Sequence, residues 1–252
     1  MKTDHVAIIT GGSRGIGRAL CLELAGRGGH VYTCARDEAA LEELSRQAEG
    51  LDGTVDPVVA DVTHLEEMSA LFERVRDEHG RLDVLVNNAG VLGPRKPIED
   101  VDLADWRTVQ SINVDGVFIA SKLAIELLRA AESSMILNVS SSVGRRGRGG
   151  WGPYAVSKHG VEGLTDTLAD ELADDGVCVV SVNPGGTATD MRHEAYPDED
   201  PATLPTAEQV AQTFALLIER LDVAQTGRKY NSRDLMDDVG NETNGEDLPY
   251  IE

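Results

Sequence analysis

Short apolar runs alternate along the chain with segments in which apolar residues recur every three or four positions. Several of the runs are apolar on both faces, which is typical of strands in a parallel sheet that helices cover on both sides. The run near the C-terminal end is the weakest of the set. The predicted strands are residues 5–10, 30–35, 55–60, 82–87, 134–140, 177–183 and 227–232.

Helical patterns fill the intervals between these strands. Segment 64–79 keeps one apolar face, as an amphipathic helix does. Segments 102–131 and 153–174 are longer and apolar on more than one face, which indicates contact with a second subunit as well as with the sheet. The alternation predicts an α/β fold: one doubly wound, mostly parallel sheet of about seven strands with helices on both faces.

No linker or repeat interrupts the pattern before about residue 233, so we expect a single domain over residues 1–232. The remaining segment, 233–252, is polar and acidic. Two expectations stay open for this tail: disorder, or docking through its few apolar side chains. Those side chains are Leu235, Met236 and Ile251.

The charge balance narrows the possible partners. The 252 residues include 44 acidic and 23 basic side chains, for a formal net charge of −21, and this opposes the basic face that a nucleic-acid binder needs. An acidic surface is the plain interpretation. Because only five of the basic residues are lysine, we favour adaptation to a high-salt cytosol, where ions screen the repulsion between like charges.

The sequence also predicts where in the cell the protein lies. No apolar stretch is long enough to span a bilayer, and the N-terminus lacks the architecture of a signal peptide, so we expect a cytoplasmic protein with no membrane partner. Cys21, Cys34 and Cys178 stand singly among apolar neighbours, which indicates reduced core residues. The six histidines show no metal-ligand spacing, and we expect no metal site.

The stretch TGGSRGIG, residues 10–17, directly follows the first predicted strand. Glycines at a strand-to-helix turn let the backbone approach a phosphate, and the free N–H groups of the helix bind the anion. Gly11, Gly15 and Gly17 are four and two residues apart, unlike the common dinucleotide fingerprint, and a tight connection without a ligand is the alternative. The strand before the turn and the helical run after it favour a dinucleotide site.

The end of the second strand, TCARDE, bears on the choice of cofactor. An acidic residue there would bind the adenosine ribose hydroxyl, whereas an arginine accommodates a 2′-phosphate. Ala35 stands at the expected acid position, Arg36 follows it, and Arg14 in the glycine turn can reach the same phosphate. Asp37 points the other way, since its carboxylate could serve the ribose, and both arginines could simply be solvated. We predict NADP(H) rather than NAD(H).

Tyr154 and Lys158 lie four residues apart in a predicted helix and so share one face, with Cβ atoms about 5–6 Å apart. A tyrosine hydroxyl normally has a pKa of about 10, and a neighbouring ammonium would lower it. The pair is therefore a candidate acid/base unit. Ser141 follows the strand 134–140, at the sheet edge where ligands of such folds bind, and its hydroxyl could hold a substrate carbonyl.

Taken together, the motifs resemble those of the short-chain dehydrogenase/reductase family, in family order over residues 5 to about 230. Such proteins have a single Rossmann domain and transfer hydride between a nicotinamide and an alcohol or carbonyl. The motifs are TGGSRGIG, NNAG (87–90), INV (112–114), SS (140–141), YAVSK (154–158) and NPGGTATDM (183–191).

The resemblance implies roles for single residues. Tyr154 matches the general acid/base, Lys158 the residue that lowers the tyrosine pKa and holds the ribose, and Ser141 the hydroxyl that positions the carbonyl. Asn113 matches a helix-distorting asparagine that orders a water; a buried, hydrogen-bonded asparagine is the plainer interpretation. The implied cofactor contacts are Gly11, Ser13, Arg14, Gly15, Ile16, Gly17, Arg36, Asp61, Val62, Asn88, Ala89, Gly90, Tyr154, Lys158, Pro184, Gly185, Thr187 and Thr189.

Two regions depart from the family pattern. Thr187 stands where an aliphatic residue is usual, and the segment from 190 to 206 is too short for a large enclosing lid, so we expect a fairly open site. The loop GRRGRGGWG, 144–152, carries Arg145, Arg146 and Arg148 and should border the substrate pocket. A solvated loop, a subunit contact and a site for a substrate anion are all consistent with these arginines.

The sequence thus predicts an NADP(H)-dependent oxidoreductase acting on a carbonyl or secondary alcohol, assembled as a homodimer or homotetramer. A 3-oxoacyl-thioester reductase is an alternative within that class. A regulatory protein that binds a dinucleotide without catalysis is an alternative of another class, although the complete set of Asn113, Ser141, Tyr154 and Lys158 speaks against it.

Overall fold

The computed structural model describes residues 5–251, and its centre is one seven-stranded sheet in the order β3-β2-β1-β4-β5-β6-β7. Every pair of neighbouring strands is parallel. All seven predicted runs form strands, so the predicted doubly wound α/β fold is confirmed. The strands are β1 (Val6–Thr10), β2 (His30–Ala35), β3 (Thr54–Val59), β4 (Val84–Asn87), β5 (Ser134–Val139), β6 (Val177–Asn183) and β7 (Lys229–Asn231).

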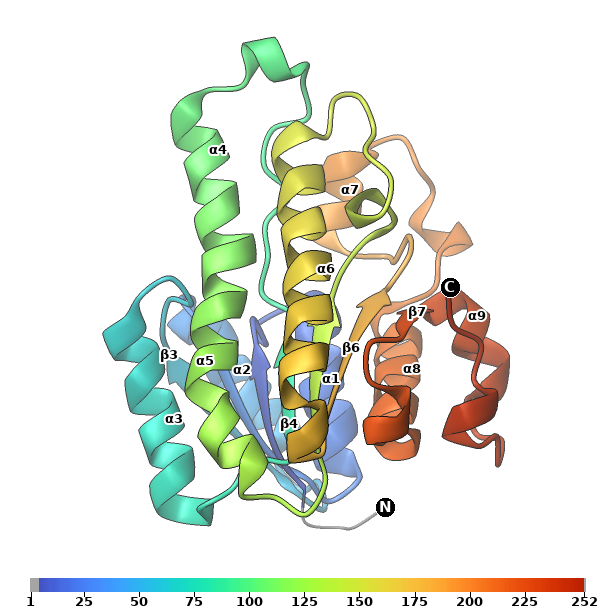
Figure 1. Ribbon diagram of the computed structural model, residues 1–252. Helices are drawn as coiled ribbons and strands as arrows, with labels where there is room; N and C mark the ends of the chain where they lie inside the picture. Colours follow the sequence, from blue (N-terminus) through green and yellow to red (C-terminus); the bar gives the residue numbers. More distant parts are fainter. Residues whose placement is uncertain (1–4, 252) are drawn as a thin grey trace.

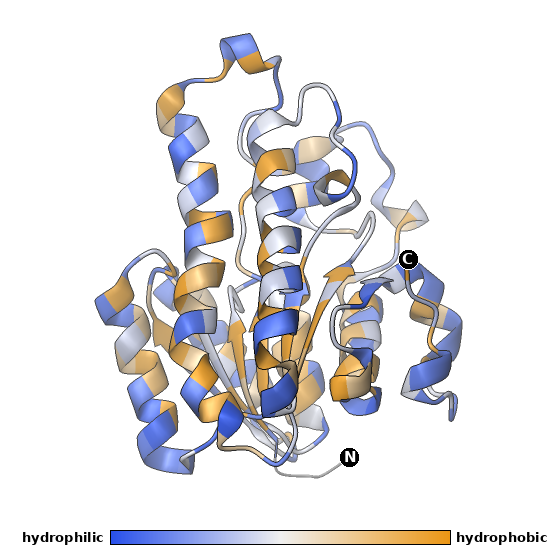
Figure 2. Cartoon of the chain, in the orientation of Figure 1, coloured by the Kyte–Doolittle hydropathy of each residue, from blue (hydrophilic) through white to orange (hydrophobic). Residues whose placement is uncertain are grey.

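Helices cover both faces of the sheet (Figure 1). One face carries α1 (Gly15–Gly26), α2 (Glu38–Ala48) and α8 (Ala207–Arg220), and the other carries α3 (Leu65–His79), α5 (Gly116–Arg129) and α6 (Gly152–Leu172). Because alternate strand side chains point to opposite faces, the sheet separates two apolar cores. Figure 2 shows the hydrophobic residues on the strands and the inner helix faces.

The predicted helical segment 102–131 is interrupted in the structure. It consists of α4 (Leu103–Gln110), a π-helical turn over Ser111–Asp115, and α5. A π turn contains one extra residue and is frequent at functional sites. Here it turns Asn113 inward, where the residue is completely buried.

The strand order reverses beside β1, whose neighbours are β2 and β4. Connections from the carboxyl ends of β1 and β4 therefore leave toward opposite faces, and a crevice opens between them. The glycine turn follows β1 and the segment 88–90 follows β4, so both predicted cofactor segments border this crevice.

The acidic tail is folded against the rest of the chain. Leu235, the last residue of α9 (Ser232–Leu235), and Leu248 are buried in the core that α1 and α8 also line, and Ile251 forms an antiparallel bridge to Lys229 of β7. Of the two expectations for this tail, docking against the domain is therefore the one that the structure shows. Residues 1–4 and 252, which the predicted domain boundaries include, lie outside the described residues.

Within residues 5–251, no helix is both long and apolar enough to cross a bilayer. The three cysteines are buried and form no disulfide, and the same range contains no cluster of His, Cys, Asp and Glu side chains suited to a metal ion.

Candidate active site

Close packing requires the glycines of the turn after β1. Gly11 has a φ of +73°, and a Cβ there would lie 2.8 Å from the Cα of Ala89. A Cβ on Gly17 would lie 2.4 Å from the carbonyl oxygen of Gly11. Gly15, with a φ of +56°, faces Thr189 of the loop after β6 at 3.5 Å. The turn thus presents a bare backbone at the start of α1, as a bound pyrophosphate requires.

Two side chains hold the turn against the end of β4. The hydroxyl of Thr10 accepts hydrogen bonds from the backbone N–H groups of Asn88 and Ala89, both at 3.1 Å. The amide of Asn88 donates to the carbonyl oxygens of Thr10 at 2.9 Å and Gly11 at 3.1 Å. Asn88, predicted as a cofactor contact, therefore shapes the turn. Thr10 was missed, although it begins the quoted motif.

Arg36 and Asp61, both predicted as cofactor contacts, lie together after β2 and β3. The exposed Arg36 guanidinium lies 3.7 Å from the carboxylate of Asp61. Burial opposes ionisation of Asp61, but hydrogen bonds from Thr63 and the charge of Arg36 outweigh it and lower its pKa. Asp37 caps α2 by accepting from the N–H of Ala40 at 3.1 Å. Its carboxylate is thus already engaged, which weakens the alternative that it binds a ribose.

Also near the crevice, the exposed Arg14 precedes α1, Ser13 and Ile16 belong to the glycine turn, and Val62 follows β3. A Cβ on Gly116 would lie 2.9 Å from a methyl group of Val62, so Val62 also packs against the start of α5.

Tyr154 lies in the first turn of α6, and its hydroxyl shares a hydrogen bond with Ser141, the residue that precedes the turn after β5. The tyrosine as a whole is half-buried, yet protein surrounds its hydroxyl. Burial raises the pKa of Tyr154 to about 12, and the bond from Ser141 lowers it only in part. The predicted serine and tyrosine are therefore in direct contact.

Lys158 is only 4% exposed and lies one helical turn after Tyr154. Its Nζ donates to the carbonyl oxygen of Val139 at 2.7 Å and lies 5.7 Å from the centre of the Tyr154 ring. Burial lowers the pKa of Lys158 to about 8, while the carboxylate of Glu162 acts in the opposite direction. Desolvation dominates the surroundings of Tyr154 in this structure, so the lowering of its pKa by Lys158 stays a prediction.

Asn113 joins the segment after β4 to α6. Its Oδ1 accepts from the N–H of Val91 at 2.8 Å, and its Nδ2 donates to Val91 O at 2.9 Å and to Ser157 Oγ at 3.0 Å. A Cβ on Gly90 would lie 3.3 Å from Asn113 Oδ1 and 3.7 Å from Lys158 Nζ. Asn113 is thus a buried, hydrogen-bonded residue that lies beside Gly90 and Lys158.

A buried carboxylate that the sequence analysis missed lies one turn beyond Lys158. Glu162 is 6% exposed and accepts hydrogen bonds from Ser140 Oγ at 2.5 Å and Ser181 Oγ at 2.8 Å. Arg145 Nε lies 3.2 Å from it and Lys229 Nζ lies 3.7 Å away. This cluster connects β5, β6, β7 and α6 directly behind Ser141, and no motif in the sequence marks it.

The loop after β6 contains the last four of the implied cofactor contacts. Pro184 begins it, and Gly185 has a φ of +73°. Thr187 is 3% exposed, and its hydroxyl has no hydrogen-bond partner within residues 5–251. Thr189 caps α7 (Asp190–Ala195) by accepting from the N–H of Arg192 at 3.3 Å. A buried hydroxyl without a partner in this loop suits a polar group such as the nicotinamide carboxamide.

The short segment after β6 covers one side of the site. Ala195 and Tyr196 pack against Trp151, whose ring centre lies 6.0 Å from that of Tyr154 and 6.0 Å from that of Tyr196. Trp151 is itself buried. The expectation of an open site is thus corrected on this side, because one short helix suffices to bring an aromatic side chain over Trp151.

The arginines of the loop 144–152 separate into different environments. Arg145 points inward, where it contacts Glu162 and donates to Asn231 Oδ1 and the carbonyl oxygen of Tyr230. Arg148 Nη1 donates to the Tyr196 hydroxyl at 3.0 Å. Arg146 is exposed, and its side chain has no hydrogen bond or ion pair within the described range.

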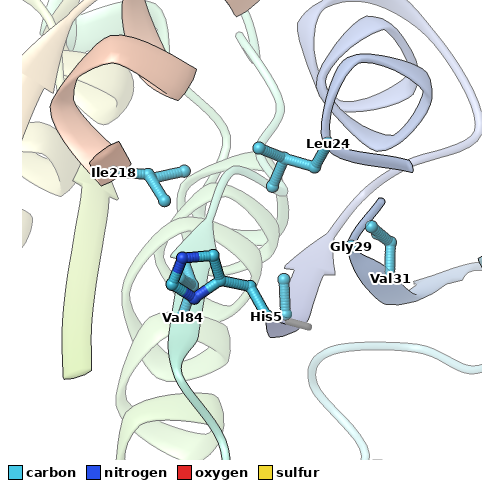
Figure 3. Close-up of a pocket in the computed structure, with 7 residues that line it drawn as sticks. His5, Leu24, Gly29, Val31, Val84 and Ile218 are labelled. Carbon is cyan, nitrogen blue, oxygen red and sulfur yellow. The ribbon is translucent and has the colours of Figure 1, made fainter. Parts of the chain in front are cut away.

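A separate cavity lies at the amino ends of the strands, between the starts of β1, β2 and β4 and the ends of α1 and α8 (Figure 3). Its lining is mostly aliphatic. Because Ser141, Tyr154 and the glycine turn all follow the carboxyl ends of strands, this cavity lies at the other edge of the sheet and is not the candidate site. It is lined by His5, Ala7, Leu24, Gly29, Val31, Val84 and Ile218.

This fold, with a glycine turn at the strand-order reversal and a Ser-Tyr-Lys set beside it, is that of a nucleotide-dependent oxidoreductase. The short chain dehydrogenase family model matches residues 5–200, and the chain belongs to that family. The prediction from the motifs is thereby confirmed.

Several relatives and solved structures match almost the whole chain. The uncharacterized oxidoreductase YciK of Escherichia coli K12 is 32% identical over 236 residues, which are 92% of this chain and 93% of the relative. A 3-oxoacyl-[acyl-carrier-protein] reductase of Synechocystis is 35% identical over 236 residues, 91% of this chain and 95% of the relative. A short chain dehydrogenase of Shigella flexneri, solved in complex with NADP, has a TM-score of 0.84 at 32% identity and covers 91% of this chain and 97% of its own.

Proposed function

We propose that the protein is an NADP(H)-dependent oxidoreductase that interconverts a carbonyl compound and a secondary alcohol. The observation that carries this proposal is the contact between Ser141 and Tyr154 beside the buried Lys158, at the sheet edge that also holds the glycine turn. A hydroxyl that positions a carbonyl, a phenol that can donate a proton and an ammonium one helical turn away form a complete proton-transfer unit.

The residues present fit a phosphorylated dinucleotide. The turn after β1 has no room for a side chain at Gly11 or Gly17, and the buried Thr187 hydroxyl in the loop after β6 has no hydrogen-bond partner among residues 5–251. Arg36 is exposed directly after β2 and Arg14 is exposed in the glycine turn, while Asp37, the acid that follows Arg36 in sequence, caps a helix. NADP complexes of relatives from Shigella flexneri and Escherichia coli support the same choice.

NADP(H), when bound, supplies or accepts the hydride. The chain itself orients the substrate and handles the proton. In reduction, the raised pKa keeps Tyr154 protonated at neutral pH, so that its hydroxyl can donate a proton to the carbonyl oxygen. Ser141 donates a hydrogen bond to the same oxygen and stabilises its developing charge. Lys158 places a positive charge near Tyr154 and has hydrogens free for a ribose beyond its bond to Val139.

The direct test is reduction of a panel of ketones and aldehydes with NADPH and, separately, with NADH. We expect turnover with NADPH and weaker turnover with NADH. The absence of turnover with every member of the panel would support a dinucleotide-binding regulator instead, and equal use of both cofactors would contradict the role of Arg36.

A 3-oxoacyl thioester is the second candidate substrate. Relatives in Synechocystis, Thermotoga maritima and Staphylococcus aureus are 3-oxoacyl-[acyl-carrier-protein] reductases, at 35%, 39% and 37% identity. Adding a 3-oxoacyl thioester and the matching simple ketone to the panel separates the two. A higher kcat/KM for the thioester than for the matching ketone would favour the 3-oxoacyl thioester as the substrate.

We further propose that the protein works in a salt-rich cytoplasm as a homodimer or homotetramer. Support for the assembly comes from exposed apolar side chains on the long helices: Leu103 on α4, Phe118 on α5 and Val156 on α6 are 60%, 51% and 48% exposed. The formal charge of −21 supports the salt requirement. Light scattering and thermal melts across a salt series test these points; a monomer, or a melting temperature independent of salt, would contradict them.

A further inference from the structure

A cluster of aromatic and cationic side chains stands at one side of the proposed active site. Three segments far apart in the sequence meet there, at the upper end of the molecule in Figure 1: the segment after β4, the loop before α6, and α7 with the residue after it. Trp151 is the link to the catalytic residues, since its ring packs against both Tyr154 and Tyr196.

Two guanidinium groups are held on this cluster. The Cζ of Arg95 lies 4.5 Å from the centre of the Trp151 ring and 4.7 Å from that of Tyr196. Arg148 donates to the Tyr196 hydroxyl at 3.0 Å. Aromatic contacts satisfy the face of a guanidinium but leave its N–H groups available to an anion.

The charges around these two arginines are unusual for this chain. Acidic residues outnumber basic ones by 44 to 23, yet neither Arg95 nor Arg148 has a carboxylate within ion-pairing distance in the range 5–251. Glu199, three residues beyond Tyr196, is engaged elsewhere, because both its oxygens bind Arg192, at 2.5 and 2.7 Å. The neighbouring Lys96 is paired with Asp102. Arg95 and Arg148 therefore remain uncompensated on the aromatic cluster, whose Trp151 packs against Tyr154.

We propose that Arg95 and Arg148 bind an anionic group, a carboxylate or a phosphate, at the end of the substrate remote from the reacting carbonyl. The substrate then spans the cluster, with its carbonyl at Ser141 and Tyr154 and its anion at the two guanidinium groups. This inference rests on the proposed function and adds to it the chemical class of the substrate.

The test compares matched substrates at constant ionic strength. One series is straight-chain oxo acids in which the carboxylate lies progressively farther from the ketone, each with its methyl ester. A second pair is a ketone bearing a phosphate monoester and the same ketone with a free hydroxyl. In the wild type we expect higher kcat/KM for the charged member of a pair at the matching length, and the two series distinguish carboxylate from phosphate.

The variants are Arg95→Leu, Arg148→Leu and the double variant, with Arg146→Leu as the matched control from the same loop. Loss of one charge-assisted contact should reduce the charged-to-neutral ratio of kcat/KM about 10- to 100-fold. Arg146→Leu should leave that ratio unchanged, and Arg95→Lys, which keeps the charge, should restore part of it. An unchanged ratio in the double variant would overturn the inference while leaving the proposed function intact.

If no ketone in the panel is reduced, that result counts against the proposed function. A binding measurement then still tests the anion site. The chain has two tryptophans, so Trp106→Phe leaves Trp151 as the only one. Its fluorescence is titrated with glutarate and with inorganic phosphate. A saturable change that the Arg95→Leu, Arg148→Leu double variant abolishes supports the anion site. No saturable change, or the same change in the double variant, refutes it.

Discussion

The buried carboxylate of Glu162 provides the sharpest prediction about how the site is held together. Glu162→Gln keeps the size of the side chain and removes its charge. Ser140 and Arg145 donate to one oxygen, while Ser181 donates to the other and Lys229 lies near it. Whichever way the new amide is turned, its NH₂ group faces a donor, and Arg145 loses its counter-charge.

The magnitude follows from the burial of the pair. Removing one partner of a buried ion pair costs about 3–5 kcal/mol, and we expect the low end, about 3 kcal/mol. The reason is that the Arg145 side chain is still 20% exposed and keeps its bonds to Asn231 and Tyr230. For a chain of this size, a loss of 3 kcal/mol lowers the melting temperature by about 6–12 °C.

The same helix offers a matched control. Asp166 also binds Lys229, at 2.9 Å, but its side chain is 55% exposed. Because exposed ion pairs contribute about 0–1 kcal/mol, Asp166→Asn should change the free energy of unfolding by less than about 1 kcal/mol. Urea denaturation of both variants at one fixed salt concentration measures the difference. If Glu162→Gln is no less stable than Asp166→Asn, the buried cluster does not stabilise the fold and the reasoning is refuted.

Three further predictions concern proton transfer and the cofactor. Burial lowers the pKa of Lys158 to about 8, so its ammonium is present below that pH and lost above it. The value of kcat/KM for reduction should therefore fall as the pH rises through about 8. A pH profile without this fall would contradict the role of Lys158. Arg36→Leu should raise the Kd for NADPH about 10- to 100-fold in a fluorescence titration and leave the Kd for NADH unchanged. If the variant loses affinity for both cofactors equally, Arg36 does not recognise the 2′-phosphate. Gly17→Ala places a Cβ 2.4 Å from Gly11 O and from Asn88 Nδ2. NADPH binding should therefore be lost, while circular dichroism still reports a folded protein. Retained affinity for NADPH would show that the turn can shift to make room.

The sequence predicts the strands well because most of them are buried on both faces, which leaves continuous apolar runs such as 177–183. It also brings Ser141, Tyr154 and Lys158 together, since helical spacing and the end of a strand determine their positions. These are properties of local structure, and local patterns report them directly.

The remaining features depend on tertiary packing. Glu162 reads as an ordinary polar helix position, and only contact with β5, β6 and β7 makes it a buried acid. In the same way, Arg145 belongs to a glycine-rich loop that reads as exposed, yet it points inward. The raised pKa of Tyr154 follows from desolvation, which spacing along a helix does not reveal.

The central claim is that Tyr154 transfers a proton to a carbonyl oxygen while the dinucleotide is held by other parts of the chain. The measurement that tests it most directly is single-turnover oxidation of bound NADPH by a ketone substrate, comparing the wild type with Tyr154→Phe. We predict that the variant binds NADPH as the wild type does and that its oxidation rate falls at least about 10²-fold. An oxidation rate equal to that of the wild type would contradict the claim.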